Sequence, residues 1–159
     1  GLYTLGPTRK NLNPSDSQSS KVIQIEVAMG AAIQCFEDST VIEVPRSRFS
    51  PVKSCEDLLA LRSDAYQVSD DFQIQLCDSR RGFPPEVVLS DEIYKNYKTF
   101  EEMTPHGAPS LKKCKSIQVE GPVKFGEEIS FQGTIKIING SKSVKEISSG
   151  KYIDNNIVL

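Results

Sequence analysis

The sequence predicts an α/β fold in two parts, with helices and strands mixed over residues 1–103 and short strands alone over residues 111–159. In the first part, apolar residues recur at helical spacing, as in Ile93, Tyr97 and Phe100, between runs of β-branched residues. In the second part, apolar and polar residues alternate in short runs separated by single glycines, which favours a β-solenoid or a compact meander. The length of 159 residues corresponds to about one domain.

The first predicted elements lie in residues 1–44. Residues 1–20 are dense in Gly, Pro, Asn and Ser and are predicted to form a loop. Residues 21–27 alternate, which predicts a short strand or its run into a helix, and apolar spacing predicts that helix over 26–36. Residues 40–44 are mostly β-branched and apolar, and predict a buried strand that ends at Pro45.

Three more elements are predicted before the chain changes character. Ser54 and Asp57 have the spacing of a capping box, which predicts a helix that ends near Tyr66. Residues 72–76 alternate and predict a two-faced strand. A loop rich in Gly and Pro then precedes a single predicted helix over 91–103, and we place the boundary between the two parts at residues 104–110.

The second part differs in charge as well as in pattern. Residues 111–159 contain eight lysines and five acidic residues, whereas the preceding residues carry an acidic excess. The pair Asn139-Gly140 stands between two apolar runs and predicts a hairpin turn rather than a glycosylation site.

Composition excludes several classes of protein. Lys and Arg number 19 against 21 Asp and Glu, and this net charge of −2 argues against a nucleic-acid-binding protein. No apolar run approaches the roughly 20 residues of a membrane span, and the N-terminal residues do not resemble a secretory signal. The four cysteines lack the spacing of zinc or redox motifs and are predicted to be the free thiols of a cytoplasmic protein.

The stretch with the most distinctive chemistry is residues 44–53. It contains Arg46, Arg48 and Lys53 without an acidic residue, between a predicted strand and a capped helix, where open α/β sheets place ligand sites. Two prolines restrict this loop. Lysine as a point charge and arginine as a planar fork both suit a phosphate group. The alternative is a solvated basic loop whose arginines pair with nearby acidic residues.

Three blocks of sequence carry a family resemblance. Residues 22–33 read Val-Ile-Gln-Ile-Glu-Val-Ala-Met-Gly-Ala-Ala-Ile, and residues 44–53 read Val-Pro-Arg-Ser-Arg-Phe-Ser-Pro-Val-Lys, followed by Asp57-Leu58-Leu59. Residues 119–126 read Val-Glu-Gly-Pro-Val-Lys-Phe-Gly, with Gly-Thr-Ile following at 133–135. Together these blocks resemble the eukaryotic UDP-glucose pyrophosphorylases (UTP–glucose-1-phosphate uridylyltransferases), and the resemblance covers nearly all of residues 11–138.

The resemblance implies a fold and a reaction. Residues 1–103 are expected to be the C-terminal end of a Rossmann-like nucleotidyltransferase domain, residues 104–110 a linker, and residues 111–159 a small left-handed parallel β-helix. The resemblance further implies that the chain is the C-terminal part of a longer enzyme. The family reaction joins UTP and glucose 1-phosphate to give UDP-glucose and pyrophosphate with Mg²⁺ present, and the resemblance places the nucleotide loop and the metal ligands upstream of this chain.

The resemblance also implies roles for five residues. Lys53 matches the family lysine that contacts the phosphates, and it is the residue expected to be catalytic as well as substrate-binding. Arg46 and Arg48 match arginines of the same loop. Gln24 and Glu26 match the segment that lines the sugar side of the site. No metal ligand is assigned within the chain.

Two other functions stay open at this point. One is a broad-specificity UDP-sugar pyrophosphorylase, because the sugar-selecting residues of the family lie mostly upstream. The other is a non-catalytic module for oligomerisation or interaction. The expected partners are the nucleotide and sugar phosphate substrates and a second copy of the chain through its β-helix, with no nucleic acid and no membrane.

Overall fold

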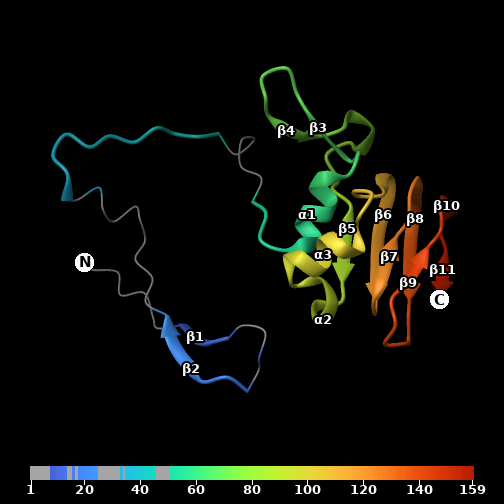
Figure 1. Ribbon diagram of the computed structural model, residues 1–159. Helices are drawn as coiled ribbons and strands as arrows, with labels where there is room; N and C mark the ends of the chain where they lie inside the picture. The colour runs from blue at the N-terminus through green and yellow to red at the C-terminus, as the bar shows by residue number, and fades with distance from the viewer. Residues whose placement is uncertain (1–7, 14–15, 17, 25–32, 34, 46–50) are drawn as a thin grey trace. The chain divides into compact units, whose positions relative to one another are not determined.

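The computed structural model describes residues 8–13, 16, 18–24, 33, 35–45 and 51–159. The chain divides into two units, residues 1–43 and 44–159, whose helices and strands Figure 1 labels. In the first unit, β1 (Thr8–Asn11) and β2 (Lys21–Gln24) pair as an antiparallel sheet. The short strand predicted over 21–27 is confirmed for its first four residues, and positions 25–27 lie outside the described residues. The helix predicted over 26–36 lies outside the described residues except at positions 33, 35 and 36.

The buried strand predicted at residues 40–44 is wrong. These residues form no regular element, and the side chains of Val41 and Ile42 are 78% and 87% exposed. A buried strand requires neighbouring strands and covering layers, and no described residue pairs with this segment. The apolar, β-branched composition of residues 40–44 favours a strand, but a strand forms only where a neighbouring strand accepts its backbone hydrogen bonds.

The predicted capping box is present at the start of α1 (Cys55–Arg62). The N–H of Asp57 donates to Ser54 Oγ at 3.3 Å, and the N–H of Ser54 donates to Asp57 Oδ2 at 3.2 Å. The helix ends before the predicted position near Tyr66. Ser63 is extended and its side chain bonds to nearby backbone groups, which competes with another helical turn.

A small hairpin follows α1. Its strands are β3 (Tyr66–Val68) and β4 (Ile74–Leu76), which pair antiparallel, and a 3₁₀ turn, η3 (Asp78–Arg80), comes next. The strand predicted over 72–76 is confirmed only for its last three residues. Phe72 instead lies in the turn of the hairpin with a φ of 58° and is 88% exposed.

The helix predicted over 91–103 is two helices, α2 (Asp91–Tyr94) and α3 (Tyr97–Met103). The break occurs at Asn96, whose side chain accepts the N–H of Lys98 at 2.9 Å and caps α3. Asparagine bonds readily to backbone groups, so it is more favourable at a cap than inside a helix.

The remaining strands pair in parallel. The larger sheet has the order β10-β8-β6-β5, with β11 also paired to β8, and a smaller sheet joins β7 to β9 (Figure 1). Their bounds are β5 (Glu86–Leu89), β6 (Ser110–Glu120), β7 (Val123–Phe125), β8 (Ile129–Ile138), β9 (Lys145–Ile147), β10 (Gly150–Ile153) and β11 (Asn156–Val158). All of these pairings are parallel, which rules out the antiparallel meander for the described strands.

The hairpin turn predicted at Asn139-Gly140 is also wrong, because β8 and β9 lie in different sheets. Asn139 is 3% exposed, and its amide donates to the carbonyls of Pro122 and Ser143, each at 2.8 Å. Its side-chain oxygen accepts the N–H of Ser141 at 3.0 Å. Asn139 therefore stabilises the corner between two parallel strands instead of reversing the chain.

One hydrophobic core unites the helices and strands of the second unit. The strands contribute alternate apolar side chains, and the helices add Leu59, Tyr94, Phe100 and Met103. The segments before and after residues 104–110 therefore pack together, with the Tyr94 hydroxyl donating to the Val123 carbonyl at 2.6 Å. The domain boundary at 104–110 stays a prediction.

Candidate functional site

Lys53 lies directly before the N-cap of α1. Its backbone N–H donates to Asp57 Oδ2 at 2.9 Å, and the same carboxylate oxygen accepts the N–H of Ser54 at 3.2 Å. One carboxylate thus binds two consecutive backbone groups where the loop enters the helix. This arrangement holds the Lys53 backbone in a defined position relative to α1.

The side chain of Lys53 is exposed. In the described part of the chain, its ammonium group forms neither an ion pair nor a hydrogen bond. The nearby Asp57 carboxylate is occupied by the backbone contacts of the capping box. The Lys53 charge is therefore available to an external anion, and a phosphate is a suitable partner for a lysine.

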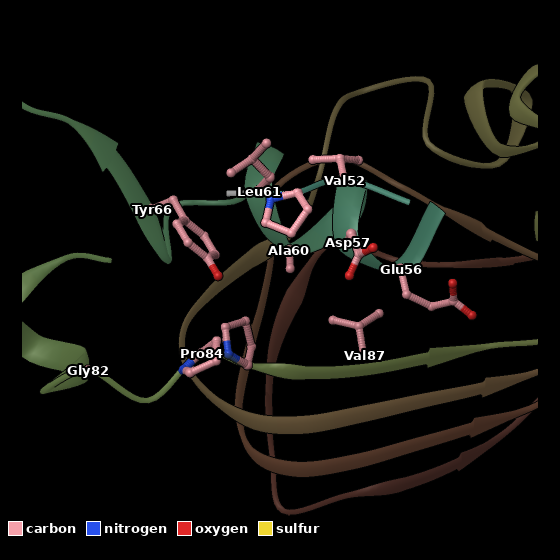
Figure 2. Close-up of a pocket in the computed structure, with 11 residues that line it drawn as sticks. Val52, Glu56, Asp57, Ala60, Leu61, Tyr66, Gly82, Pro84 and Val87 are labelled. Atoms are coloured by element: carbon pink, nitrogen blue, oxygen red, sulfur yellow. The ribbon is translucent and has the colours of Figure 1, made fainter. Parts of the chain in front are cut away.

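A cavity of about 650 Å³ lies beside α1. Its apolar walls include Val52, Leu61 and Val87, and its polar groups are the carboxylates of Glu56 and Asp57 and the hydroxyl of Tyr66. Figure 2 shows the Tyr66 hydroxyl on one side of the cavity and the two carboxylates on the other, with Val87 of β5 below them. The cavity is therefore built from α1, β3 and β5 together.

The chemistry of this cavity does not suit a phosphate. Burial raises the pKa of the Tyr66 hydroxyl, which stays protonated at neutral pH. The other polar groups are carboxylates, and like charges disfavour the binding of an anion. Lys53 does not line this cavity, so we treat the exposed lysine and the cavity as separate features.

The other predicted site residues receive little structural description. Arg46, Arg48 and Glu26 lie outside the described residues. Gln24 ends β2, where it pairs with Thr8 in the first unit, whereas Lys53 belongs to the second unit. The grouping of these five residues into one site stays a prediction.

No magnesium site is assembled by the residues that the structure describes. Among them, no three His, Cys, Asp or Glu side chains cluster in a way that could hold a metal ion. The described residues thus offer no group of three such ligands for the Mg²⁺ that the family resemblance implies. None of the described helices is long and apolar enough to cross a membrane.

Two features of the site were missed by sequence reasoning. The Ser54-to-Asp57 spacing predicts the capping box. It does not predict that the backbone N–H of Lys53 also donates to Asp57 Oδ2, because that bond depends on the backbone conformation at Lys53, outside the motif. The cavity brings α1 next to Val87, and nothing in the sequence between them signals that approach.

The chain matches the model of a protein family described as UTP–glucose-1-phosphate uridylyltransferase over residues 7–132. The Musa acuminata enzyme of that name is 36% identical over 146 residues, covering 92% of this chain and 31% of the relative. The Saccharomyces cerevisiae enzyme is 32% identical over 152 residues, covering 96% of this chain and 30% of the relative. The chain thus spans about a third of the length of the curated relatives it matches.

Solved structures show the same similarity. The UDP-glucose phosphorylase of Trypanosoma brucei superposes with a TM-score of 0.80 at 47% identity, covering 96% of this chain and 33% of that one. A mutant UDP-glucose pyrophosphorylase from Leishmania major in complex with UDP-glucose gives a TM-score of 0.77 at 46% identity, covering 96% and 32%. The mixed α/β fold with its parallel sheet therefore matches known structures.

Proposed function

This chain belongs to the UTP–glucose-1-phosphate uridylyltransferase family, and from that membership we propose that the intact protein makes UDP-glucose and pyrophosphate from UTP and glucose 1-phosphate. The observation that carries the proposal is the family match over residues 7–132, together with relatives of that name and activity. Because the chain spans about a third of those relatives, the reaction is proposed for the intact protein. The test is the formation of UDP-glucose by that protein from the two substrates.

In this proposal, Lys53 contacts the phosphate groups of the substrates. Phosphoryl-type transfer depends mainly on positioning and on neutralising the charge on phosphate oxygens. The Lys53 backbone is held by Asp57, and its ammonium is exposed without a partner in the described part of the chain. Arg46 and Arg48 are proposed to add charge from the same loop, and Gln24 and Glu26 to line the sugar side. Mg²⁺ is proposed to bind elsewhere in the intact protein.

We also propose that residues 111–159 form a left-handed parallel β-helix after the end of a Rossmann-like domain. The parallel pairing of β6 with β8, and of β8 with β10 and β11, supports successive turns stacked on one another. Apolar residues repeat at paired positions, as in Val119 with Ile137 and Ile137 with Ile157. The handedness rests on the family resemblance.

We place the intact protein in the cytoplasm. The four cysteines, Cys35, Cys55, Cys77 and Cys114, are all free thiols. Thiols are kept reduced in the cytosol, whereas secreted proteins usually pair them.

The 159-residue chain alone is expected to have no pyrophosphorylase activity. Its sequence contains no glycine-rich nucleotide loop, and the chain spans about a third of the family enzymes. The chain and the intact protein are incubated separately with UTP, glucose 1-phosphate and Mg²⁺, and pyrophosphate is measured. Pyrophosphate above background with the chain alone would contradict this expectation. An inactive intact protein would instead favour a non-catalytic module.

Self-association of the intact protein is proposed to occur through the strands β10 and β11. Within the described residues each of these strands pairs only with β8, which leaves one backbone edge of each strand for another chain. Ile153 and Val158 on these strands are 47% and 77% exposed. Deleting residues 111–159 is a poor test, because these residues share a core with α1, α2 and α3.

The double variant Ile153→Lys and Val158→Lys in the intact protein is therefore expected to lower its oligomeric mass, because charged residues on a strand edge oppose pairing. Light scattering gives the mass, and Val144→Lys, at a site 49% exposed outside these two strands, is the matched control. An unchanged mass in the double variant would refute association through these strands.

A further inference from the structure

A second cavity, of about 410 Å³, lies between η3 and β6. Four cationic residues line it: Arg80, Lys112, Lys113 and Lys115. Its other lining residues are neutral, and no carboxylate lines it. We call this cavity the basic cleft.

An irregularity in β6 brings the three lysines to the basic cleft. The pairing of β6 with β8 shifts in register between Ser110 and Lys113 and again between Cys114 and Ser116. Neighbouring residues of a regular strand point to opposite faces, yet Lys112 and Lys113 are both exposed and both line the cleft. Bulges of this kind redirect side chains and are frequent beside functional sites.

Arg80 is held rigidly at the same position. Its Nε donates to the Phe83 carbonyl at 2.7 Å, and its Nη1 donates to the carbonyls of Leu111, at 2.9 Å, and Cys114. These acceptors are neutral carbonyl groups, so they hold the guanidinium in place without neutralising its positive charge. Its Nη2 forms no hydrogen bond within the part of the chain that the structure describes, which leaves donors for a ligand. A side chain ordered in advance loses less entropy when a ligand binds.

The positive charge of the basic cleft is not neutralised locally. None of the three lysines forms an ion pair with another described residue. The adjacent Cys114 thiol adds no negative charge, because burial raises its pKa to about 11. The nearby Asp64 carboxylate accepts the N–H groups of Leu111 and Lys112, at 2.8 and 2.9 Å, and does not line the cleft.

We propose that the basic cleft binds a diphosphate group, either as inorganic pyrophosphate or as part of a nucleotide. Four cationic residues line this cavity without a carboxylate, so a multiply charged anion is the ligand whose charge complements it. The planar guanidinium and the compact ammonium groups together match the oxygens of two linked phosphates. This site goes beyond the proposed function, because none of its residues belongs to the loop that contains Lys53.

Calorimetric titration of the 159-residue chain at low ionic strength tests the proposal, with inorganic pyrophosphate in one arm and uridine diphosphate in the other. The triple variant Lys112→Gln, Lys113→Gln and Lys115→Gln is expected to bind pyrophosphate about tenfold more weakly or worse, because each substitution removes a charge-assisted hydrogen bond. The matched control is Lys95→Gln, Lys98→Gln and Lys142→Gln, which changes net charge equally at exposed sites elsewhere. Its affinity is expected to stay within about twofold, since distant charges are screened.

The two arms identify the source of the diphosphate. Comparable binding of both probes assigns a nucleotide diphosphate to the cleft, whereas binding of pyrophosphate alone assigns the free anion. Arg80→Lys keeps the charge but loses the planar fork, so it is also expected to weaken binding, and thermal melting checks that each variant is folded.

Three results would overturn the proposal. The first is that the chain does not bind pyrophosphate at about 10 mM. The second is that the lysine variant of the cleft and the control variant bind pyrophosphate equally weakly. The third is that Lys53→Ala abolishes pyrophosphate binding while the lysine variant of the cleft retains it. The titration requires no catalysis, so its outcome is independent of whether the intact protein is a uridylyltransferase.

Discussion

Lys53→Ala in the intact protein is expected to lower kcat/KM of the proposed reaction by about 10²–10³, or ~2.7–4 kcal/mol of transition-state stabilisation, as is typical for a preorganised electrostatic group. The substitution removes the ammonium that we propose contacts the phosphates. It leaves the backbone bond from Lys53 to Asp57 in place, and it breaks no side-chain contact of the described residues. The melting temperature is therefore expected to stay unchanged, and steady-state kinetics measure the loss.

Two further variants sharpen this test. Lys53→Arg is expected to restore activity only in part, because a planar fork and a compact ammonium contact a phosphate differently. Lys98→Ala, at another exposed position, is expected to keep nearly full activity. A Lys53→Ala enzyme with normal melting and less than about a tenfold loss, ~1.4 kcal/mol, would show that Lys53 is a surface lysine without a catalytic role.

Phe131→Ala is expected to lower the free energy of unfolding of the chain by about 3–5 kcal/mol, because a large cavity forms in a closely packed core. Phe131 of β8 is 0% exposed. Its ring meets that of Phe125 of β7 edge-on, with centroids 6.2 Å apart, and that of Tyr152 of β10 at 5.8 Å. The side chain therefore joins three strands from two sheets. Urea titration of the 159-residue chain gives the change.

The matched control is Phe72→Ala, which removes the same side chain at a position 88% exposed. Its effect is expected to stay within about 0.5 kcal/mol, as for most surface substitutions. Equal effects of the two substitutions would mean that the aromatic contacts around Phe131 do not stabilise the fold.

Features determined by residues close in sequence were predicted well. The capping box needs only Ser54 and Asp57 at the correct spacing, and the structure contains it. The strands predicted after residue 110 are present, and apolar residues of the alternating runs, such as Ile117 of β6 and Ile135 of β8, are buried. Local hydrogen bonding also explains an error: the apolar spacing over 91–103 predicts one helix, but the side chain of Asn96 caps a second one.

Features that depend on distant partners were not predicted. Residues 40–44 have the composition of a buried strand, yet the described residues provide no neighbouring strand for them. Asn139-Gly140 has the signature of a hairpin, yet parallel pairing places the flanking strands in different sheets. Both patterns are short and local, whereas the pairing of strands is decided by contacts between segments far apart in the chain.

The candidate sites divide in the same way. The sequence by itself determined the family, through the blocks at residues 22–33 and 44–53, and it identified Lys53 as a candidate phosphate ligand. Only the tertiary structure decided that Asp57 holds the Lys53 backbone and that Arg80 shares a cleft with Lys113. A motif is recognised from residues close together in the sequence. The basic cleft instead forms because a register shift in β6 exposes lysines beside Arg80, whose guanidinium comes from a distant segment and donates to the Leu111 carbonyl. The approach of Arg80 to the lysines of β6 depends on how the whole second unit packs.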